Sequence, residues 1–253
     1  MSGSAAAAVP EVLTPEWPAP QTVRAAFTLR SGGVSAPPFD SLNLGAHVGD
    51  SPAAVAENRR RVRARLDLPA EPAWLEQVHG TRVADLDAAG GDGGSPADAV
   101  LTRRARRVCA VQVADCMPVL FAARDASAVA VAHAGWRGLA AGVLEATVEK
   151  LRVARGDLIA WLGPAISVRH FEVGEEVHQA FLARDADAGA AFVRNARGRW
   201  QCDLVSLARR RLAALGVTDV SGGTWCTYAD PARFFSFRRD GRCGRMAALI
   251  WLE

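Results

Sequence analysis

Cysteine is scarce in this chain, and long uncharged apolar runs are missing from it. The 253 residues include five cysteines, an odd number, widely spaced and without a CxxC pair. Such spacing argues against a disulfide framework and predicts a protein of a reducing compartment, the cytoplasm. Residues 1–20 lack the basic start and the apolar centre of a signal peptide, and no apolar run approaches the length of a membrane span. We therefore expect a flexible segment over residues 1–20 and no membrane partner.

A large excess of charge of either sign is also lacking. The 30 basic residues are nearly matched by 27 acidic ones, and only one basic residue, Lys150, is a lysine. Arginine presents a fixed fork of donors to carboxylates and phosphates, although the abundance of Ala and Gly indicates that composition bias explains most of the arginines. The basic run at residues 56–65 has no interleaved aromatic residues, which favours a solvated helix face and predicts no nucleic-acid partner.

Half of the residues are hydrophobic, which is ample material for a buried core. Apolar runs typical of strands occur at 23–29, 74–78, 82–86, 108–113, 119–122, 128–132, 158–162 and 247–252. Helices are predicted over 51–66, 139–151, 174–182 and 203–215, with Gly-rich loops at 31–50 and 90–95. Hairpin-like neighbours and βα units are mixed, which predicts an α+β (mixed α/β) fold. We expect a single domain over 21–253 with layered mixed β-sheets flanked by helices.

One thiol and two imidazoles lie where strand-like runs end. Cys116, in A-D-C-M-P-V (114–119), lies at a break between two predicted strands, because Asp and Pro flank it. His133 ends another strand-like run and opens H-A-G-W-R-G (133–138), so the two residues are close enough to be hairpin neighbours. His79 supplies a second imidazole in a similar setting. Three such ligands could form a metal site with an open fourth position, as in catalytic zinc sites.

Other interpretations of these residues stay open at this point. Cys116 could act without a metal as a nucleophile, with His133 as its base. A fourth imidazole, His47, could close a structural zinc site that binds a protein partner, because structural sites have four protein ligands. His170 and His178 are interpreted as structural residues of a helical region.

Two segments could hold an anion. The small residues after His133 place backbone amides near a predicted helix start, with Arg137 beside them. The C-terminal segment F-F-S-F-R-R-D-G-R-C-G-R (234–245) places Arg238 and Arg239 in a Gly-punctuated loop, where a guanidinium fork can meet a phosphate. The alternative is a surface turn with salt bridges to Asp240.

Several short motifs resemble, in content and order, those of one protein family. They run from about residue 24 to the C-terminus: S-L-N-L-G-A-H-V-G-D (41–50), V-A-E-N-R (55–59), Q-V-H-G (77–80), A-D-A-V-L-T (97–102), A-D-C-M-P-V (114–119), H-A-G-W-R-G (133–138), L-G-P-A-I (162–166), F-E-V-G (171–174), C-T-Y (226–228) and F-F-S-F-R-R-D-G (234–241). On these motifs the chain resembles the laccase-domain or YfiH-like proteins, also called multicopper polyphenol oxidase domains and purine nucleoside phosphorylase-like enzymes. The resemblance implies a single α/β domain of layered sheets.

The resemblance also implies a chemistry, in which His79, Cys116 and His133 ligate one zinc. Such an enzyme cleaves adenosine, inosine and methylthioadenosine with phosphate, releasing a base and ribose 1-phosphate, and deaminates adenosine. Purine nucleosides and phosphate are then the partners, and no obligatory protein partner is implied. A second family role is a zinc amidase that edits a serine-containing peptidoglycan precursor. The residues expected to bind substrate or phosphate are Arg137, Arg238, Arg239, Arg59 and Asn43.

Physical chemistry separates these activities. A multicopper oxidase needs a blue-copper centre and a trinuclear cluster, together about ten histidines, whereas this chain has five. A single copper held by two histidines, Cys116 and Met117 can still be built, so copper stays an alternative to zinc. Zinc lowers the pKa of a bound water toward neutrality, which suits deamination and amide hydrolysis. Phosphorolysis needs a phosphate held beside C1′ of the ribose, and how one site performs both reactions is left open.

Overall fold

The computed structural model describes residues 9–88 and 96–253. Its strands are β1 (Val12–Leu13), β2 (Val23–Thr28), β3 (Ala73–Trp74), β4 (Val83–Asp85), β5 (Ala99–Thr102), β6 (Val108–Val113), β7 (Met117–Ala123), β8 (Val129–Ala134), β9 (Leu158–Leu162), β10 (Glu172–Val173), β11 (Phe192–Arg194), β12 (Trp200–Cys202), β13 (Asp219–Gly222) and β14 (Met246–Leu252). Its helices are α1 (Pro52–Arg65), α2 (Trp136–Ala141), α3 (Val143–Leu151), α4 (Glu175–Leu182), α5 (Leu204–Ala214) and α6 (Phe237–Asp240), with 3₁₀ turns η1 (Arg155–Asp157) and η2 (Ala186–Ala191).

The described strands form two large sheets and a small one. One large sheet has the order β1-β2-β14-β6-β3, the other has the order β13-β9-β7-β8-β5-β4, and β10-β12-β11 form the small sheet. In each large sheet most neighbours are antiparallel, but β3 runs parallel to β6, β4 to β5 and β13 to β9. The prediction of mixed sheets in an α+β fold is therefore confirmed.

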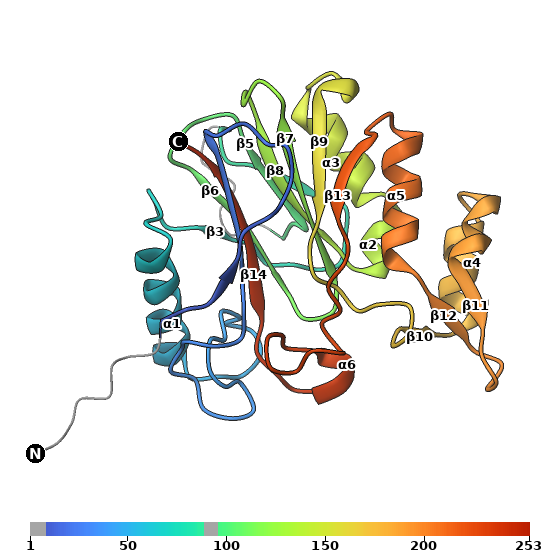
Figure 1. Cartoon of the computed structure of the whole chain (residues 1–253), viewed down its shortest axis with the longest axis horizontal. Helices are drawn as coiled ribbons and strands as arrows, with labels where there is room; N and C mark the ends of the chain where they lie inside the picture. The colour runs from blue at the N-terminus through green and yellow to red at the C-terminus, as the bar shows by residue number, and fades with distance from the viewer. Residues whose placement is uncertain (1–8, 89–95) are drawn as a thin grey trace, which may run out of the picture.

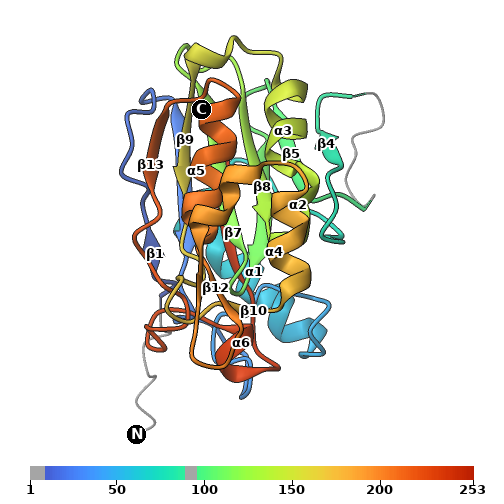
Figure 2. The same ribbon diagram turned by 90° about the vertical axis from the view of Figure 1, so that its right-hand side faces the viewer.

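The two large sheets pack face to face and are covered by helices on both outer faces (Figure 1). Between the sheets, Phe27 and Ile250 from one sheet lie in the same apolar cluster as Leu120 and Val131 from the other. Helices α2, α3 and α5 cover the outer face of the six-stranded sheet, in front of its strands in Figure 2. Helix α1 covers the other outer face, where Val62 is buried. Each such side chain contributes about 1.5–3 kcal/mol when fully buried.

Most predicted elements are present, with two informative differences. The helix predicted over 139–151 begins earlier, at Trp136, and is divided into α2 and α3 by Gly142, whose φ of 105° breaks the right-handed helix. The strand predicted over 74–78 ends at Trp74. Beyond it, the side chain of Gln77, rather than the backbone, bonds to the main chain of Gln112 in β6. The loop predicted over 90–95 lies outside the described residues.

The N-terminal segment differs from the prediction of a flexible stretch over 1–20. Residues 1–8 lie outside the described part of the chain, but Val12–Leu13 forms β1, which pairs with β2 at Phe27 and Thr28. Trp17 packs against the core between the sheets. These apolar contacts explain why the second half of the segment is ordered. No described helix has the length and apolar character needed to cross a lipid bilayer.

Candidate metal centre and its cavity

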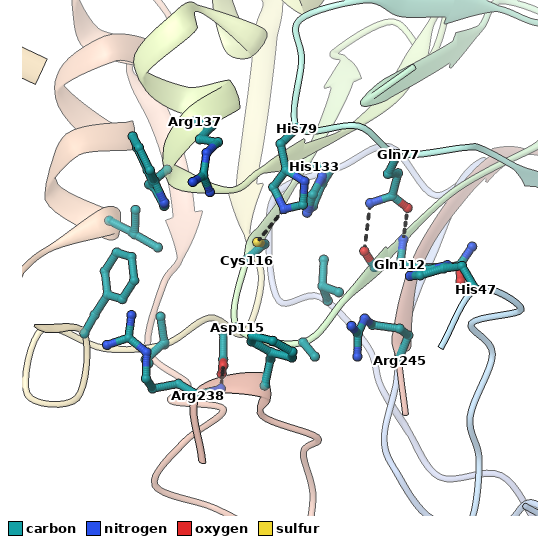
Figure 3. Close-up of a pocket in the computed structure, with 17 residues that line it drawn as sticks. His47, Gln77, His79, Gln112, Asp115, Cys116, His133, Arg137, Arg238 and Arg245 are labelled. Carbon is teal, nitrogen blue, oxygen red and sulfur yellow. Dashed lines mark hydrogen bonds between the residues drawn. The ribbon is translucent and has the colours of Figure 1, made fainter. Parts of the chain in front are cut away.

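The two imidazoles and the thiol singled out in the sequence meet in the structure. The ligand atoms of His79, Cys116 and His133 all lie within 4.8 Å of one another. Nε2 of His79 is 3.8 Å from Sγ of Cys116, and the two histidine rings face each other edge-on with centroids 4.8 Å apart. Figure 3 shows the three side chains pointing toward one point at the wall of a cavity.

Strand pairing explains why Cys116 and His133 are neighbours. In the β7–β8 hairpin, Met117 pairs with Ala134 and Pro118 pairs with His133. Cys116 directly precedes β7, and His133 lies near the end of β8, so both side chains lie at the same edge of the sheet. The predicted hairpin relationship is therefore confirmed.

His79 reaches the same point from a strained turn after β3. Its φ is 59°, a left-handed conformation that non-glycine residues seldom adopt. Asp98, fully buried before β5, stabilises this turn: its Oδ1 accepts from the amide of His79 at 2.9 Å, and its Oδ2 accepts from the amides of Val78 and Gly80 at 3.2 and 2.6 Å. Backbone strain of this kind persists at functional sites only where the surroundings hold it.

The same carboxylate also orients His133. Oδ1 of Asp98 lies 2.8 Å from Nδ1 of His133, so Nδ1 donates and the other ring nitrogen, Nε2, is directed to the cluster. A carboxylate behind a ligating histidine fixes its tautomer and raises its basicity in metal sites. Although burial opposes ionisation, the hydrogen bonds from His133 and from the backbone amides lower the pKa of Asp98, so it stays a carboxylate.

The protonation of the cluster favours a thiolate. Burial alone would raise the thiol pKa, but the facing imidazoles of His133 and His79 outweigh it and lower the pKa of Cys116. The pKa of His133 is raised, against burial, by Cys116 and Asp98. A metal ligand must be a thiolate or a neutral imidazole, so His133 would have to give up its second proton to hold a cation together with Cys116 and His79.

The donor set fits a metal of the zinc type. One thiolate and two imidazoles suit zinc, and three protein ligands leave a fourth position open, as catalytic sites require. In the described part of the chain the ligand cluster contains these three residues and no fourth. His47 lines the adjoining cavity but is not a member of the cluster, which gives no support to a closed structural site.

The cluster opens into a cavity of about 430 Å³, a size that suits a small molecule. Arg137 and Arg238 lie to one side of the cluster, and Arg245, Gln112 and His47 lie to the other (Figure 3). The apolar part of the lining comes from Val113, Ala114, Trp136, Ile166, Phe171, Leu204 and Phe237. A ligand in this cavity would extend across the metal position with polar groups at both ends.

Two of the arginines expected to bind phosphate reach the cavity. The guanidinium of Arg137 lies over the ring of Trp136 at 4.4 Å and has no carboxylate or carbonyl partner among the described residues. Arg238 donates one terminal nitrogen to the carbonyl of Glu172 at 2.7 Å and lies over Phe171. The backbone amide of Arg238 donates to Asp115 at 2.7 Å, which fixes α6 beside the metal ligands.

The other three expected residues lie outside the cavity lining. Arg239 donates to the carbonyls of Thr227, Tyr228 and Phe234 and pairs with Asp240, so its guanidinium is used within its own loop. This salt bridge to Asp240 agrees with the alternative interpretation of the segment 234–245, a surface turn with salt bridges instead of a phosphate site.

Arg59 and Asn43 support the wall of the cavity from behind. Arg59 donates twice to the carbonyl of Leu44, at 3.1 and 2.9 Å, and lies over Trp74. The buried Asn43 accepts from the amides of Gly45 and Arg245, both at 2.9 Å. Neither residue lines the cavity, and the hydrogen bonds above engage both with the backbone. Phosphate binding by Arg59 and Asn43 stays a prediction.

Sequence reasoning did not assign Asp98, Asp115, Gln112 or Arg245 to the site. Asp98 and Asp115 are the second residues of the motifs at 97–102 and 114–119, yet an acidic residue beside a strand does not show from which groups it will accept hydrogen bonds. Asp115 has a φ of 84° and accepts from the hydroxyl of Thr227 at 2.6 Å, 112 positions away along the chain. Gln112 lies in an apolar run, where its one polar side chain was the available signal.

Comparison with known proteins gives a consistent result over nearly the whole chain. Residues 24–253 match the family described as multi-copper polyphenol oxidoreductase laccase. The chain is 55% identical over 242 residues to purine nucleoside phosphorylase PA4543 of Pseudomonas aeruginosa, covering 95% of this chain and 98% of that protein. It is 51% identical over 247 residues to purine nucleoside phosphorylase YfiH of Escherichia coli, covering 96% and 99%.

Solved structures agree with these sequence matches. A Neisseria meningitidis protein, NMB0706, superposes with a TM-score of 0.91 at 48% identity, covering 96% of this chain and 99% of that one. A hypothetical protein YfiH of Bacillus licheniformis gives a TM-score of 0.87 at 31% identity, covering 98% of both chains. On the family match over residues 24–253 and on relatives at 55% and 51% identity over nearly the whole chain, this chain belongs to the multi-copper polyphenol oxidoreductase laccase family.

Proposed function

We propose that this protein is a zinc-dependent purine nucleoside phosphorylase that also deaminates adenosine. The substrates are adenosine, inosine and methylthioadenosine with inorganic phosphate, and the products are a purine base and a ribose 1-phosphate. Relatives that carry the name purine nucleoside phosphorylase support the substrate class. The observation that carries the proposal is the combination of a three-ligand cluster with an open position and an arginine without an anionic partner in one cavity.

The residues of this chain fit the steps of phosphorolysis. In that reaction a phosphate oxygen forms a bond to C1′ of the ribose while the C1′–N9 bond breaks and its electron pair passes to the purine. Arg137 supplies a free guanidinium fork for the phosphate, and the uncommitted nitrogens of Arg238 lie at the same end of the cavity. Holding both reactants in one geometry supplies much of the rate enhancement of such an enzyme.

A zinc bound by His79, Cys116 and His133 would supply Lewis-acid chemistry and a lowered pKa for water. The contribution of the chain is to hold these ligands ready. Asp98 fixes the tautomer of His133 and the turn that carries His79, and the strand pairing fixes Cys116. Zinc is favoured over copper because an electron-transfer copper is enclosed, whereas this cluster faces a cavity. We place the protein in the cytoplasm, since all five cysteines are free thiols.

A second candidate function rests on the same atoms. Asp98, His133 and Cys116 have the order of a Cys-His-Asp catalytic triad, and the lowered pKa of Cys116 would make it a nucleophile. A metal-free hydrolase of this type has no use for His79, whose ring nitrogen faces the same sulfur. That third donor favours the metal.

Untagged protein should be analysed for metals and then assayed on inosine with and without phosphate. The proposal predicts about one zinc per chain, and hypoxanthine release that requires phosphate and yields ribose 1-phosphate. Adenosine without phosphate should release ammonia. Base release that is equal without phosphate would contradict the phosphorylase. Activity that survives chelation but is lost on alkylation would favour the cysteine hydrolase, and activity on a seryl muramyl nucleotide in place of nucleosides would favour the zinc amidase.

A further inference from the structure

The end of the cavity that faces away from Arg137 contains an unexplained buried polar group. Gln112 is 5% exposed and lines the cavity, yet its Oε1 makes no hydrogen bond to any described residue. A buried acceptor without a partner costs about 1–3 kcal/mol, so native proteins seldom keep one without use. Figure 3 places this side chain beside His47 and near Arg245, on the opposite side of the metal ligands from Arg137.

This end of the cavity is held firmly by the residues behind it. Asn43 accepts from the amides of Gly45 and Arg245, Arg59 donates twice to the carbonyl of Leu44, and Asn58 donates to the carbonyl of Asn43 at 2.8 Å. The loop that carries His47 is therefore fixed from three directions. Such support is what a preorganised binding site needs.

Gly45 lets this loop lie directly on the polar cluster. A Cβ at this position would lie 2.7 Å from Cγ of Arg245 and 3.3 Å from Oε1 of Gln112. Arg245 gives one terminal nitrogen to the carbonyls of Cys243 and Gly244, at 2.9 and 3.1 Å, which leaves donors of its guanidinium for a ligand. The cluster thus offers an amide, an imidazole and a guanidinium on one wall.

The chemistry of the two ends differs, and the difference distinguishes their ligands. Arg137 offers donors alone, which suits a phosphate. Gln112 offers an uncharged amide whose acceptor needs a donor, whereas a phosphate dianion consists mainly of charged acceptor oxygens and has a single O–H to give. A purine has both kinds of group: adenine has the N6 amino group beside ring acceptors, and hypoxanthine has N1–H beside the O6 acceptor. One rotatable amide can satisfy either edge, as Gln and Asn do when they read adenine in nucleic acids.

We propose that Gln112, with Arg245 and His47 beside it, forms the purine-recognition subsite and accepts both 6-amino and 6-oxo purines through its side-chain amide. The inference rests on the proposed function and adds the position and the specificity of the base. It places the base and the phosphate on opposite sides of the metal ligands, so that the ribose lies between them. Arg245 then faces the purine as negative charge develops on it during cleavage of the C1′–N9 bond.

The test is equilibrium binding of free adenine and free hypoxanthine to the zinc-loaded protein by calorimetry, since neither base reacts without ribose. Gln112→Glu replaces the amide by a group that only accepts, so it loses the hydrogen bond to the acceptor atom of either base and should weaken adenine and hypoxanthine alike by about tenfold or more. Gln112→Leu should weaken both bases by at least about tenfold. Gln21→Glu, an exposed glutamine before β2, is the matched control and should change neither.

Kinetics give an independent measurement. In Gln112→Glu the kcat/KM for inosine and that for adenosine should both fall about tenfold, with the KM for phosphate unchanged, whereas Arg137→Gln should raise the KM for phosphate and leave the binding of the free bases unchanged. Zinc content and a cooperative melt show that each variant is folded. Unchanged affinity for both bases in both Gln112 variants, or no base binding by the wild type, would overturn the subsite. A wild type that binds the free bases but shows no phosphate-dependent base release would instead refute the proposed phosphorylase activity and leave the base subsite standing, because base binding is measured separately.

Discussion

Asp98 is predicted to control metal affinity although it is not itself a ligand. It accepts four hydrogen bonds, from Nδ1 of His133 and from the amides of Val78, His79 and Gly80. In Asp98→Asn one of the two acceptor oxygens becomes a donor, so two of the four donors lose their acceptor. If the new amide faces His133, the ring takes the other tautomer and its Nε2 carries a proton, which blocks a metal.

The expected magnitudes follow from these contacts. Loss of a carboxylate partner behind a ligating histidine costs about 10–100-fold in metal affinity, which corresponds to about 1.4–2.8 kcal/mol. Two buried donors without acceptors cost about 2–6 kcal/mol of folding free energy, at about 1–3 kcal/mol each. The second cost is comparable with the whole stability of a marginal domain, so affinity must be measured on protein that is shown to be folded.

The assay is zinc competition against a chromophoric chelator, together with thermal unfolding of the metal-free protein. Asp87→Asn is the matched control, because Asp87 accepts from the hydroxyl of Thr102 at 2.8 Å and from the amide of Arg103 at 2.6 Å, away from the cluster. The control should lower the melting temperature and keep the zinc affinity. A folded Asp98→Asn protein that binds zinc within about threefold of the wild type would refute the reasoning, since loss of such a partner should lower the zinc affinity at least about tenfold.

Three further predictions concern the cluster itself. Cys116→Ala should abolish both zinc binding and phosphorolysis, and an active zinc-loaded variant would contradict the metal assignment. Gly135→Ala should weaken zinc binding, measured by the same competition, because its Cβ would lie 2.8 Å from Sγ of Cys116 and 3.1 Å from Cδ2 of His79. In metal-free protein at pH 7, iodoacetamide should modify Cys116 before Cys109 and Cys202, because the pKa of Cys116 is lowered and burial raises the other two. Zinc should protect Cys116, as mass spectrometry of the labelled peptides would show.

The sheet core was predictable because its strands are nearly continuous apolar runs. The predicted strands 108–113 and 158–162 coincide with the observed β6 and β9. Every side chain in these two strands is buried, so the apolar run in the sequence has the same bounds as the strand. The start of α5 could also be predicted, because Asp is a favourable N-cap residue. Asp203 accepts a hydrogen bond from the amide of Ser206 at 3.0 Å. The division of the helix predicted over 139–151 into α2 and α3 was missed, because the Gly142 break depends on a left-handed φ that the surrounding apolar pattern does not reveal.

The cluster of His79, Cys116 and His133 could be predicted because each of them is a rare residue type with metal-binding chemistry near the end of a strand-like run. The substrate residues could not be separated in the same way, because an arginine looks the same in a sequence whether its donors face a ligand or a carbonyl. Arg59 donates to the carbonyl of Leu44 and Arg239 donates within its own loop, whereas Arg137 has no hydrogen-bond acceptor among residues 9–88 and 96–253.

Some residues of the sequence motifs support the wall of the cavity and do not line the cavity themselves. Asn43 and Arg59 fix the loop that presents His47 and the backbone of Arg245, much as Asp98 fixes His79 and His133. In both cases a buried polar side chain that satisfies several backbone groups sets the position of the group that faces the cavity. Because each such side chain holds several partners at once, replacing it should disturb a whole wall of the cavity, whereas replacing a residue that faces the ligand, such as Arg137, should affect one ligand alone.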